Sequence, residues 1–308
     1  MTAQVETWTA SNGTELEFLH HDHGSDDLVV WFSAFTRGPI LGRIMKVSPR
    51  FHGFRLSGTA TRHNWLLMRD SAGLTGDGTY YGGSAGNLFM EEAVREKVTQ
   101  MITMHREAHP QGKIIAMGSS MGGYAAMKFG LLCGFDGVFI YSPHLDLKIA
   151  MEHCGRGPWI RHCLSGDAEL DSAYLSRLQR VVDGHSETQL PPLILQTSID
   201  DSYVYPEQVA PFIETYSRMG GVVTLDLRDS GGHGSMNAQD AYILAAVASL
   251  VENSTLDLEG LRKLPPRPFT RQEKIERVLH HAEAFAARLL RRGFRASKTS
   301  EPGREARP

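Results

Sequence analysis

The chain of 308 residues has little cysteine and lacks long apolar runs. Its three cysteines, Cys133, Cys154 and Cys163, have no C-x-x-C spacing, which excludes a disulfide framework or a structural zinc site as the basis of the fold. No stretch of about 18 apolar residues could span a membrane, and no basic segment followed by an apolar run opens the sequence. We therefore expect a cytoplasmic protein without a membrane span, a metal or a cofactor.

The chain also lacks a strong charge of one sign. Its formal net charge is -3, so no overall basic field is available to recruit nucleic acid. Hydrophobic residues make up 41% and charged residues 22% of the sequence, a composition typical of a globular protein with a sizeable core. A small-molecule partner is therefore favoured over a nucleic acid.

Short runs rich in Val, Ile and Leu alternate with helical patterns along residues 1–252. This alternation predicts an α/β fold, in which helices cover both faces of a mostly parallel central sheet. The predicted strands are Leu28–Phe32, Trp65–Arg69, Lys113–Met117, Val138–Tyr141, Pro192–Thr197 and Val222–Leu227. The predicted helices span residues 87–108, 123–132, 206–219 and 237–252, where apolar residues recur at three-to-four spacing.

Two further segments differ in character from this α/β domain. Residues 144–190 are irregular and rich in His, Cys, Gly and Arg, which we interpret as a small cap inserted into the domain. Residues 253–295 are basic, and an apolar stripe along 271–293 predicts an amphipathic helix. That helix can dock on its own domain, pair two copies of the chain as a homo-oligomer, or lie on an acidic surface. The apolar-poor tail 296–308 is expected to be disordered.

The most informative motif is Gly118-Ser119-Ser120-Met121-Gly122, a G-x-S-x-G sequence between a predicted strand and a predicted helix. The two glycines permit a sharp turn, because side chains at positions 118 and 122 would collide with the adjacent strand and helix. Ser120 would be exposed at the carboxyl end of the sheet as a nucleophile. The helix that follows points its first N–H groups and its positive dipole end at the reacting centre. We therefore expect the Met121 N–H to be one donor to an oxyanion.

A serine hydroxyl needs a nearby base, normally a histidine oriented by a carboxylate. His233 follows the last predicted strand in the sequence RDSGGHGS, whose glycines allow a loop to return to Ser120. Two adjacent carboxylates, Asp200 and Asp201, follow the strand before it. Only one of them can point at the histidine, and Asp146 and Asp229 are further alternatives for the acid.

Ser120, an acid and His233 occur in the chain order of α/β-hydrolases, and residues 15–252 resemble that superfamily. The loop from Asp201 to Gln208, DSYVYPEQ, is similar to the D-x-x-V-P-x-E-Q loop that follows this strand in many members. The resemblance therefore implies Asp201 as the acid that orients His233. It also implies a second oxyanion donor after the first parallel strand, in SAFTRG, where the Phe35 N–H takes the place of the H-G-x loop. The usual His-Gly is replaced there by Ser-Ala.

Three segments, FSAFTRG, RDSAGLTGDGTYYGGSAGN and YSPHLDL, further resemble bacterial hydrolases linked to accessory secretion and capsules. This likeness implies an acyl substrate on a small molecule or a glycoconjugate. Because a loop that leaves the carboxyl edge of a sheet faces the site, Tyr80 and Tyr81 are candidate substrate-binding residues, unless their loop is simply surface.

The predicted function is a serine esterase or acyl hydrolase that cleaves an ester or thioester bond through an acyl-enzyme on Ser120. Two alternatives remain at this stage: an acyltransferase with the same triad, and a binding protein that keeps the fold without activity. Two groups resemble metal sites, residues 20–23 (HHDH) and Cys154 and Cys163 with His153 and His162. We expect an exposed turn between two early strands for the first and cap packing for the second, because the spacing does not suit structural zinc.

Overall fold

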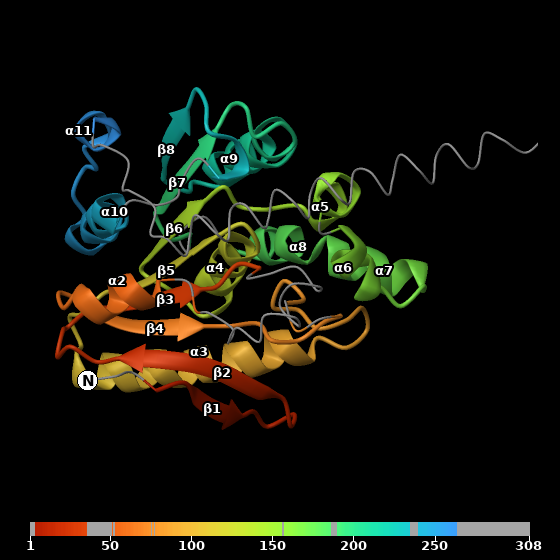
Figure 1. The fold of residues 1–308 in the computed structure, drawn as a ribbon, viewed down its shortest axis with the longest axis horizontal. Coiled ribbons are helices and arrows are strands. Elements are labelled where there is room, and N and C mark those ends of the chain that lie inside the picture. The colour runs from red at the N-terminus through yellow and green to blue at the C-terminus, as the bar shows by residue number, and fades with distance from the viewer. Residues whose placement is uncertain are drawn as a thin grey trace, which may run out of the picture.

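The computed structural model describes residues 4–35, 51, 53–74, 76, 78–155, 157–185, 190–234 and 240–263. These residues form a single sheet with helices on both faces (Figure 1). The strands are β1 (Glu6–Thr9), β2 (Glu15–His21), β3 (Leu28–Phe32), β4 (Asn64–Met68), β5 (Ile114–Ser119), β6 (Gly137–Tyr141), β7 (Leu193–Ser198) and β8 (Val223–Arg228). Their order across the sheet is β1-β2-β4-β3-β5-β6-β7-β8.

The six neighbouring strands β4, β3, β5, β6, β7 and β8 are parallel, whereas β1 and β2 form an antiparallel edge. The central strands are buried on both faces, which explains why their sequences, such as LVVWF in β3 and NWLLM in β4, are almost continuously apolar. Because the strands from β4 to β8 run in one direction, the loops after them meet at one edge of the sheet.

The helices and helical turns occupy the connections between strands. They are α2 (Phe54–Thr59), α3 (Phe89–Ala108), α4 (Met121–Leu132), α5 (Leu147–His153), α6 (Gly157–His162), α7 (Ala168–Leu175), α8 (Arg177–Asp183), the π-helical turn η2 (Tyr205–Val209), α9 (Ala210–Arg218), the 3-10 turn η3 (Gly232–Gly234), α10 (Asp240–Glu252) and α11 (Leu258–Arg262).

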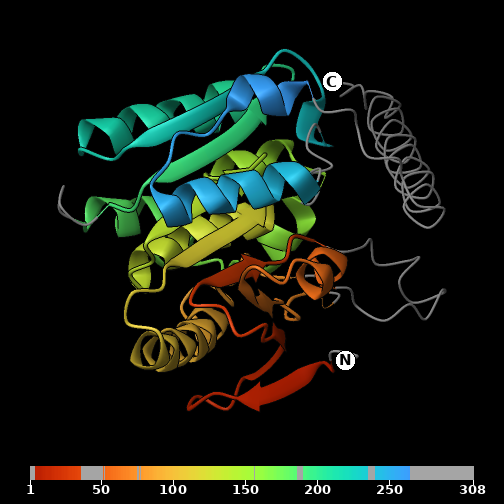
Figure 2. The ribbon, with the colours of Figure 1, turned by 90° about the vertical axis from the view of Figure 1, so that its left-hand side faces the viewer.

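Two hydrophobic cores lie on the two faces of the sheet. The first joins alternate strand residues to α3, α4, α8 and α9, and the second joins the other strand residues to α2 and α10, with α11 packed against it. Figure 2 shows α10 lying across this second face. The alternation of side chains along each strand therefore supplies both cores, as expected for a sheet covered on both sides.

The six strands predicted from the sequence are present, each within two residues of its expected ends. The predicted helices at 87–108 and 123–132 are present as α3 and α4, that at 206–219 as η2 followed by α9, and that at 237–252 as α10, whose described part begins at Asp240. Two differences appear. The edge hairpin β1–β2, where charged residues and threonines alternate with apolar ones, was not among the strands predicted with bounds. Residues 144–190, read as irregular, contain the helices α5 to α8. Figure 1 shows α5, α6 and α7 beyond the end to which the β4 arrow points.

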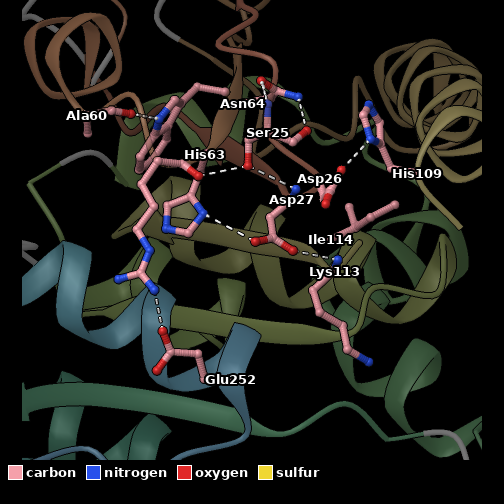
Figure 3. A network of polar contacts seen from close by, with 12 residues as sticks. Ser25, Asp26, Asp27, Ala60, His63, Asn64, His109, Lys113, Ile114 and Glu252 are labelled. Carbon is pink, nitrogen blue, oxygen red and sulfur yellow. Dashed lines mark hydrogen bonds and ion pairs between the residues drawn. The ribbon is translucent and has the colours of Figure 1, made fainter. Parts of the chain in front are cut away.

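A polar network holds together the opposite, amino ends of the central strands (Figure 3). Asp27 Oδ1 accepts a hydrogen bond from the Lys113 N–H at 2.9 Å, and the Asp27 carbonyl accepts from the Asn64 N–H at 2.9 Å. The buried His63 ring lies beside the same carboxylate, with Nδ1 3.7 Å from Asp27 Oδ2. These contacts hold the first residues of β3, β4 and β5 side by side at the amino edge of the sheet.

Among the residues that the structure describes, no helix is both long and apolar enough to cross a membrane. The amphipathic helix predicted at 271–293 and the tail 296–308 lie outside the described residues. Within the predicted extension 253–295, the structure describes residues up to Lys263, including α11.

Candidate active site

Ser120 lies in the tight turn between β5 and α4, at the carboxyl edge of the sheet. Its backbone has φ 50° and ψ -119°, a conformation that residues with a side chain seldom adopt and that is often found at functional sites. The Ser120 N–H donates to the carbonyl oxygens of Tyr141 and Ser142, at 3.3 and 3.1 Å. The end of β6 and the residue after it therefore hold the strained residue in place.

The glycines of the motif let β5, α4 and β3 approach closely. A Cβ on Gly122 would lie 2.1 Å from the Phe32 carbonyl oxygen, and a Cβ on Gly118 would lie 2.3 Å from the Gly122 carbonyl oxygen. Both distances are far shorter than any normal carbon–oxygen contact. The G-x-S-x-G spacing is thus a packing requirement of this turn.

The structure brings His233 and Asp201 to Ser120 from two different loops. His233, in η3 after β8, has Nε2 3.0 Å from Ser120 Oγ and Nδ1 3.0 Å from Asp201 Oδ2. Because the carboxylate accepts at Nδ1, the ring takes the tautomer whose Nε2 accepts from the serine hydroxyl. The Asp201 side chain is 3% exposed and that of His233 is 37% exposed. The carboxylate is therefore shielded, whereas the base can be reached.

The neighbouring carboxylate, Asp200, points elsewhere. It accepts hydrogen bonds from Ser198 Oγ at 2.7 Å and from the N–H groups of Gly231 and Gly232 at 3.0 and 2.7 Å. The Ser198 hydrogen bond and then those two N–H groups lower the pKa of Asp200. Asp200 thus fastens the loop that carries His233 without contacting its ring.

The remaining candidate acids have other positions. Asp146 is the N-cap of α5, where its carboxylate accepts from the N–H groups of Lys148 and Ile149 at 2.8 and 3.0 Å. Asp229 is exposed. The His233 ring forms its hydrogen bonds with Ser120 and Asp201.

The two predicted oxyanion donors come from two segments of the chain, one directly after Ser120 and one after β3. Met121 is the first residue of α4, and the N–H groups in the first turn of a helix have no acceptor within that helix. Phe35 follows β3, and its ring meets the edge of Tyr80 with 5.3 Å between centroids. Met121 therefore directly follows the nucleophile in the chain, and Phe35 follows β3, the strand that pairs with β5. Their role as oxyanion donors stays a prediction.

Tyr80 and Tyr81, predicted to bind substrate, are core residues with 1% and 0% exposure. The Tyr81 hydroxyl donates to the carbonyl oxygens of Ser33 and Met68, both at 3.0 Å. Neither ring is exposed in this structure, and a role for either tyrosine in substrate binding stays a prediction. The Tyr81 hydroxyl thus joins its loop to the ends of β3 and β4, whereas the Tyr80 hydroxyl lies 2.8 Å from His144 Nδ1. Buried hydroxyls need such partners inside the protein.

His144, to which no role was assigned from the sequence, lies beside the candidate base. His144 follows β6, is 1% exposed, and stacks on His233 with 4.7 Å between ring centroids and 19° between ring planes. Burial, and then the nearby His233, lower the pKa of His144 well below its usual value. The signal in the sequence was its place just after a parallel strand, at the edge where Ser120 also lies.

The two groups that resembled metal sites do not form one. His20 and His21 belong to β2 and pair with Leu66 and Trp65 of β4, so they do not form the exposed turn that the sequence analysis expected. Within the described ranges, no group of three or more His, Cys, Asp or Glu side chains is placed to hold a metal ion.

The comparisons with known proteins identify the fold. No family model matches the chain, and no curated protein sequence matches it. Among solved structures, it is similar to the capsule O-acetyltransferase of Neisseria meningitidis serogroup A, with a TM-score of 0.61 and 15% identity over 81% of this chain and 95% of that one.

Two further solved structures have the same architecture. For the S-formylglutathione hydrolase from Agrobacterium tumefaciens, the TM-score is 0.54 and the identity 16%, over 82% of this chain and 95% of that one. For the acylaminoacyl peptidase of Pyrococcus horikoshii, the TM-score is 0.55 and the identity 14%, over 89% of this chain and 44% of that one. The chain has the α/β-hydrolase fold, and these structural neighbours are enzymes.

Proposed function

We propose that this chain is a serine hydrolase that cleaves an ester or thioester bond through an acyl-enzyme on Ser120. The observation that carries the proposal is the continuous line of contacts from Ser120 Oγ to His233 and on to Asp201, with 3.0 Å at each step. These distances are within the range in which a base takes a proton from a nucleophile and a carboxylate orients the base. The strained backbone of Ser120 adds independent support.

In the acylation step, Ser120 Oγ attacks the carbonyl carbon of the substrate while its proton passes to His233 Nε2. The imidazolium that forms is stabilised by the buried carboxylate of Asp201. Collapse of the tetrahedral intermediate breaks the bond to the leaving alcohol or thiol, which takes the proton from Nε2. The acyl group then remains on Ser120 as an ester.

The negative oxygen of the tetrahedral intermediate needs hydrogen-bond donors close to the turn that carries Ser120. We assign this role to the N–H groups of Met121 and Phe35. The dipole of α4 also favours negative charge at its amino end. Each such donor is typically worth about 2.7 to 4 kcal/mol at the transition state.

In the second step, water gives its proton to His233 and attacks the acyl carbon, which releases the acid and restores Ser120. An alcohol that enters in place of water would make the protein an acyltransferase with the same three residues. This second candidate is favoured by one observation, the similarity in fold to a capsule O-acetyltransferase. We infer a substrate whose acyl group is carried by a small molecule or a glycoconjugate.

The division of the chain belongs to the same proposal. Residues 144–190, which hold α5 to α8, would act as a cap that selects the substrate on an α/β domain formed by residues 1–252. The segment 253–295 would then serve as an extension that can pair two copies of the chain.

The test is labelling of the purified chain with a fluorophosphonate probe, which reacts with activated serines. Ser120→Ala and His233→Ala should each abolish labelling, whereas Ser119→Ala, in the adjacent serine, should keep it. Removal of the nucleophile or base of such a triad costs about 10⁶-fold in kcat, so hydrolysis of p-nitrophenyl esters by either variant should fall to background.

The same assay separates the candidate functions. Esters of increasing acyl length would size the acyl pocket, and a transfer product that grows with added alcohol at the expense of free acid would identify a transferase. Absence of labelling in folded wild-type protein would refute the enzyme proposal in favour of a binding protein. Labelling that survives Ser120→Ala would refute the assignment of the nucleophile.

A further inference from the structure

We propose that His144 is a positioning residue, whose uncharged ring stacks on the face of His233 and holds that ring in line between Ser120 and Asp201. This inference rests on the proposed function, because it concerns the ring that acts as the base there. It assigns a role to a buried histidine that the triad mechanism leaves unused.

His144 contacts both the base and the nucleophile's turn. Its ring is nearly parallel to that of His233, with 19° between the planes and 4.7 Å between the centroids. Its backbone N–H donates to the carbonyl oxygen of Ser120 at 3.2 Å. One residue therefore contacts both the turn that carries the nucleophile and the ring that activates it.

Hydrogen bonds on both nitrogens fix the His144 ring. Nδ1 is 2.8 Å from the Tyr80 hydroxyl, and Nε2 is 3.3 Å from the Tyr203 hydroxyl. A hydroxyl can donate or accept, so a neutral imidazole with one N–H and one acceptor nitrogen satisfies both contacts. The ring is thus locked in its plane without the need for a charge.

The stack limits how His233 can move. To turn over about its side-chain bond, the His233 ring must pass through an orientation perpendicular to its present plane. His144, 1% exposed and held at both nitrogens, occupies the space on that face. Rotation would break both bonds of the base, to Ser120 and to Asp201, so a barrier to rotation preserves the reactive arrangement.

The charge state of His144 also suits this role. When His233 takes the serine proton it becomes a cation, and a second cation on its face would oppose that step. Burial, and then His233 itself, keep the pKa of His144 far below its usual value, so the stacked ring stays neutral. An uncharged aromatic face against a cation is a favourable contact.

The structure behind His144 is built to hold Tyr80 in place. Tyr80 and Tyr81 both have positive φ, 54° and 53°, which costs energy in residues with a side chain. The buried Lys128 ammonium donates to the Tyr81 carbonyl at 2.9 Å and pairs with Glu91 at 3.0 Å. This network keeps the strained turn in the position from which the Tyr80 hydroxyl reaches His144.

The test compares His144→Ala, which removes the stack, with His144→Phe, which keeps an aromatic ring of similar size and loses both hydrogen bonds. For hydrolysis of a short p-nitrophenyl ester, His144→Ala should lower kcat about 100-fold, as expected for misplacement of a reacting group by about 1 Å, with KM changed less than about threefold. His144→Phe should recover at least about tenfold of that loss. His63→Ala, which removes another buried histidine at the opposite end of the sheet, should leave kcat unchanged.

A spectroscopic readout separates positioning from general destabilisation. In wild-type protein the proton shared by His233 Nδ1 and Asp201 should give a far-downfield NMR resonance, which should broaden or vanish in His144→Ala and persist in His63→Ala. A folded His144→Ala with wild-type kcat would overturn the inference. If His144→Ala does not fold, a His144→Phe protein with kcat about 100-fold down would overturn it instead. Undiminished labelling of Ser120→Ala would refute the proposed function itself, whatever His144 does.

Discussion

Asp200 and Asp201 are adjacent carboxylates, and replacing each by asparagine tests which one orients the base. Asp201→Asn keeps the shape of the side chain but removes the charge that faces His233 Nδ1 at 3.0 Å. With its NH₂ group toward the ring, the asparagine would donate to Nδ1 and force the ring proton onto Nε2. The ring could then no longer accept the proton of Ser120.

The expected loss follows from that change of tautomer. An equivalent substitution in a serine triad lowers kcat by about 10⁴-fold, which corresponds to about 5.5 kcal/mol of transition-state stabilisation. The 3% exposure of Asp201 supports an effect of this size, because little water can replace the lost charge.

Asp200→Asn should behave differently. Its carboxylate accepts from Ser198, Gly231 and Gly232 and holds the loop around His233, but it is exposed to solvent. An asparagine retains one acceptor oxygen for that loop. We therefore expect kcat to fall by no more than about tenfold, because water screens contacts at exposed sites.

The assay is kcat for a short p-nitrophenyl ester at saturating substrate, measured for both variants with melting temperatures as the control for folding. The reasoning would be refuted by an Asp200→Asn protein as inactive as Asp201→Asn. It would equally be refuted by an Asp201→Asn protein that keeps more than about a tenth of the wild-type kcat, since a triad acid should cost far more.

Three further predictions concern the turn around Ser120 and the buried ion pair of Glu91 and Lys128. Gly122→Ala should lower kcat by about 100-fold if α4 shifts by about 1 Å, because the new Cβ would lie 2.1 Å from the Phe32 carbonyl oxygen; a wild-type kcat would contradict this. Glu91→Gln should lower the free energy of unfolding in urea by about 3 to 5 kcal/mol, because it removes the carboxylate 3.0 Å from the buried Lys128 ammonium; a loss below about 1 kcal/mol would contradict this. Burial raises the pKa of Glu91, but the Lys128 charge and the Arg177 hydrogen bond outweigh it and leave that pKa below its usual value. The stability from Glu91 is therefore present above about pH 4.5 and lost as the pH falls further, so an acid titration should destabilise wild type more steeply than Glu91→Gln.

The parallel strands β3 to β7 could be predicted because they are buried on both faces. Such strands are short apolar runs, and the turns after them break the pattern. The edge hairpin is harder to detect, because β1 and β2 are partly exposed and mix Glu and Thr with apolar residues. Tertiary pairing with β4 decides its position, and no local pattern in residues 4–21 encodes that pairing.

The cap region shows a second limit of periodicity. The helices α5 to α8 have between six and eight residues each, about two turns, which is too short for a three-to-four spacing to repeat. Their ends are set by local capping instead, as at Asp146 and Asp167, whose carboxylates accept from the N–H groups that follow. A scan for amphipathic windows therefore reads this stretch as irregular.

In the candidate site, too, some residues can be predicted from the local sequence and others only from tertiary contacts. Ser120, Asp201 and His233 each stand in a local sequence that indicates a catalytic role. His144 lies in the segment YSPHLDL, which indicates no role for it, and its contact with His233 forms only when the loops after β6 and β8 meet at the edge of the sheet. The burial of Tyr80 has no local signal either: its loop leaves the expected edge of the sheet, but the buried Asp70 accepts from the Tyr81 N–H at 2.7 Å and holds the turn in the core. The strand order gives the one usable rule, because β6 is the neighbour of β5. A residue just after β6, such as His144, therefore lies at the same edge of the sheet as Ser120, which follows β5.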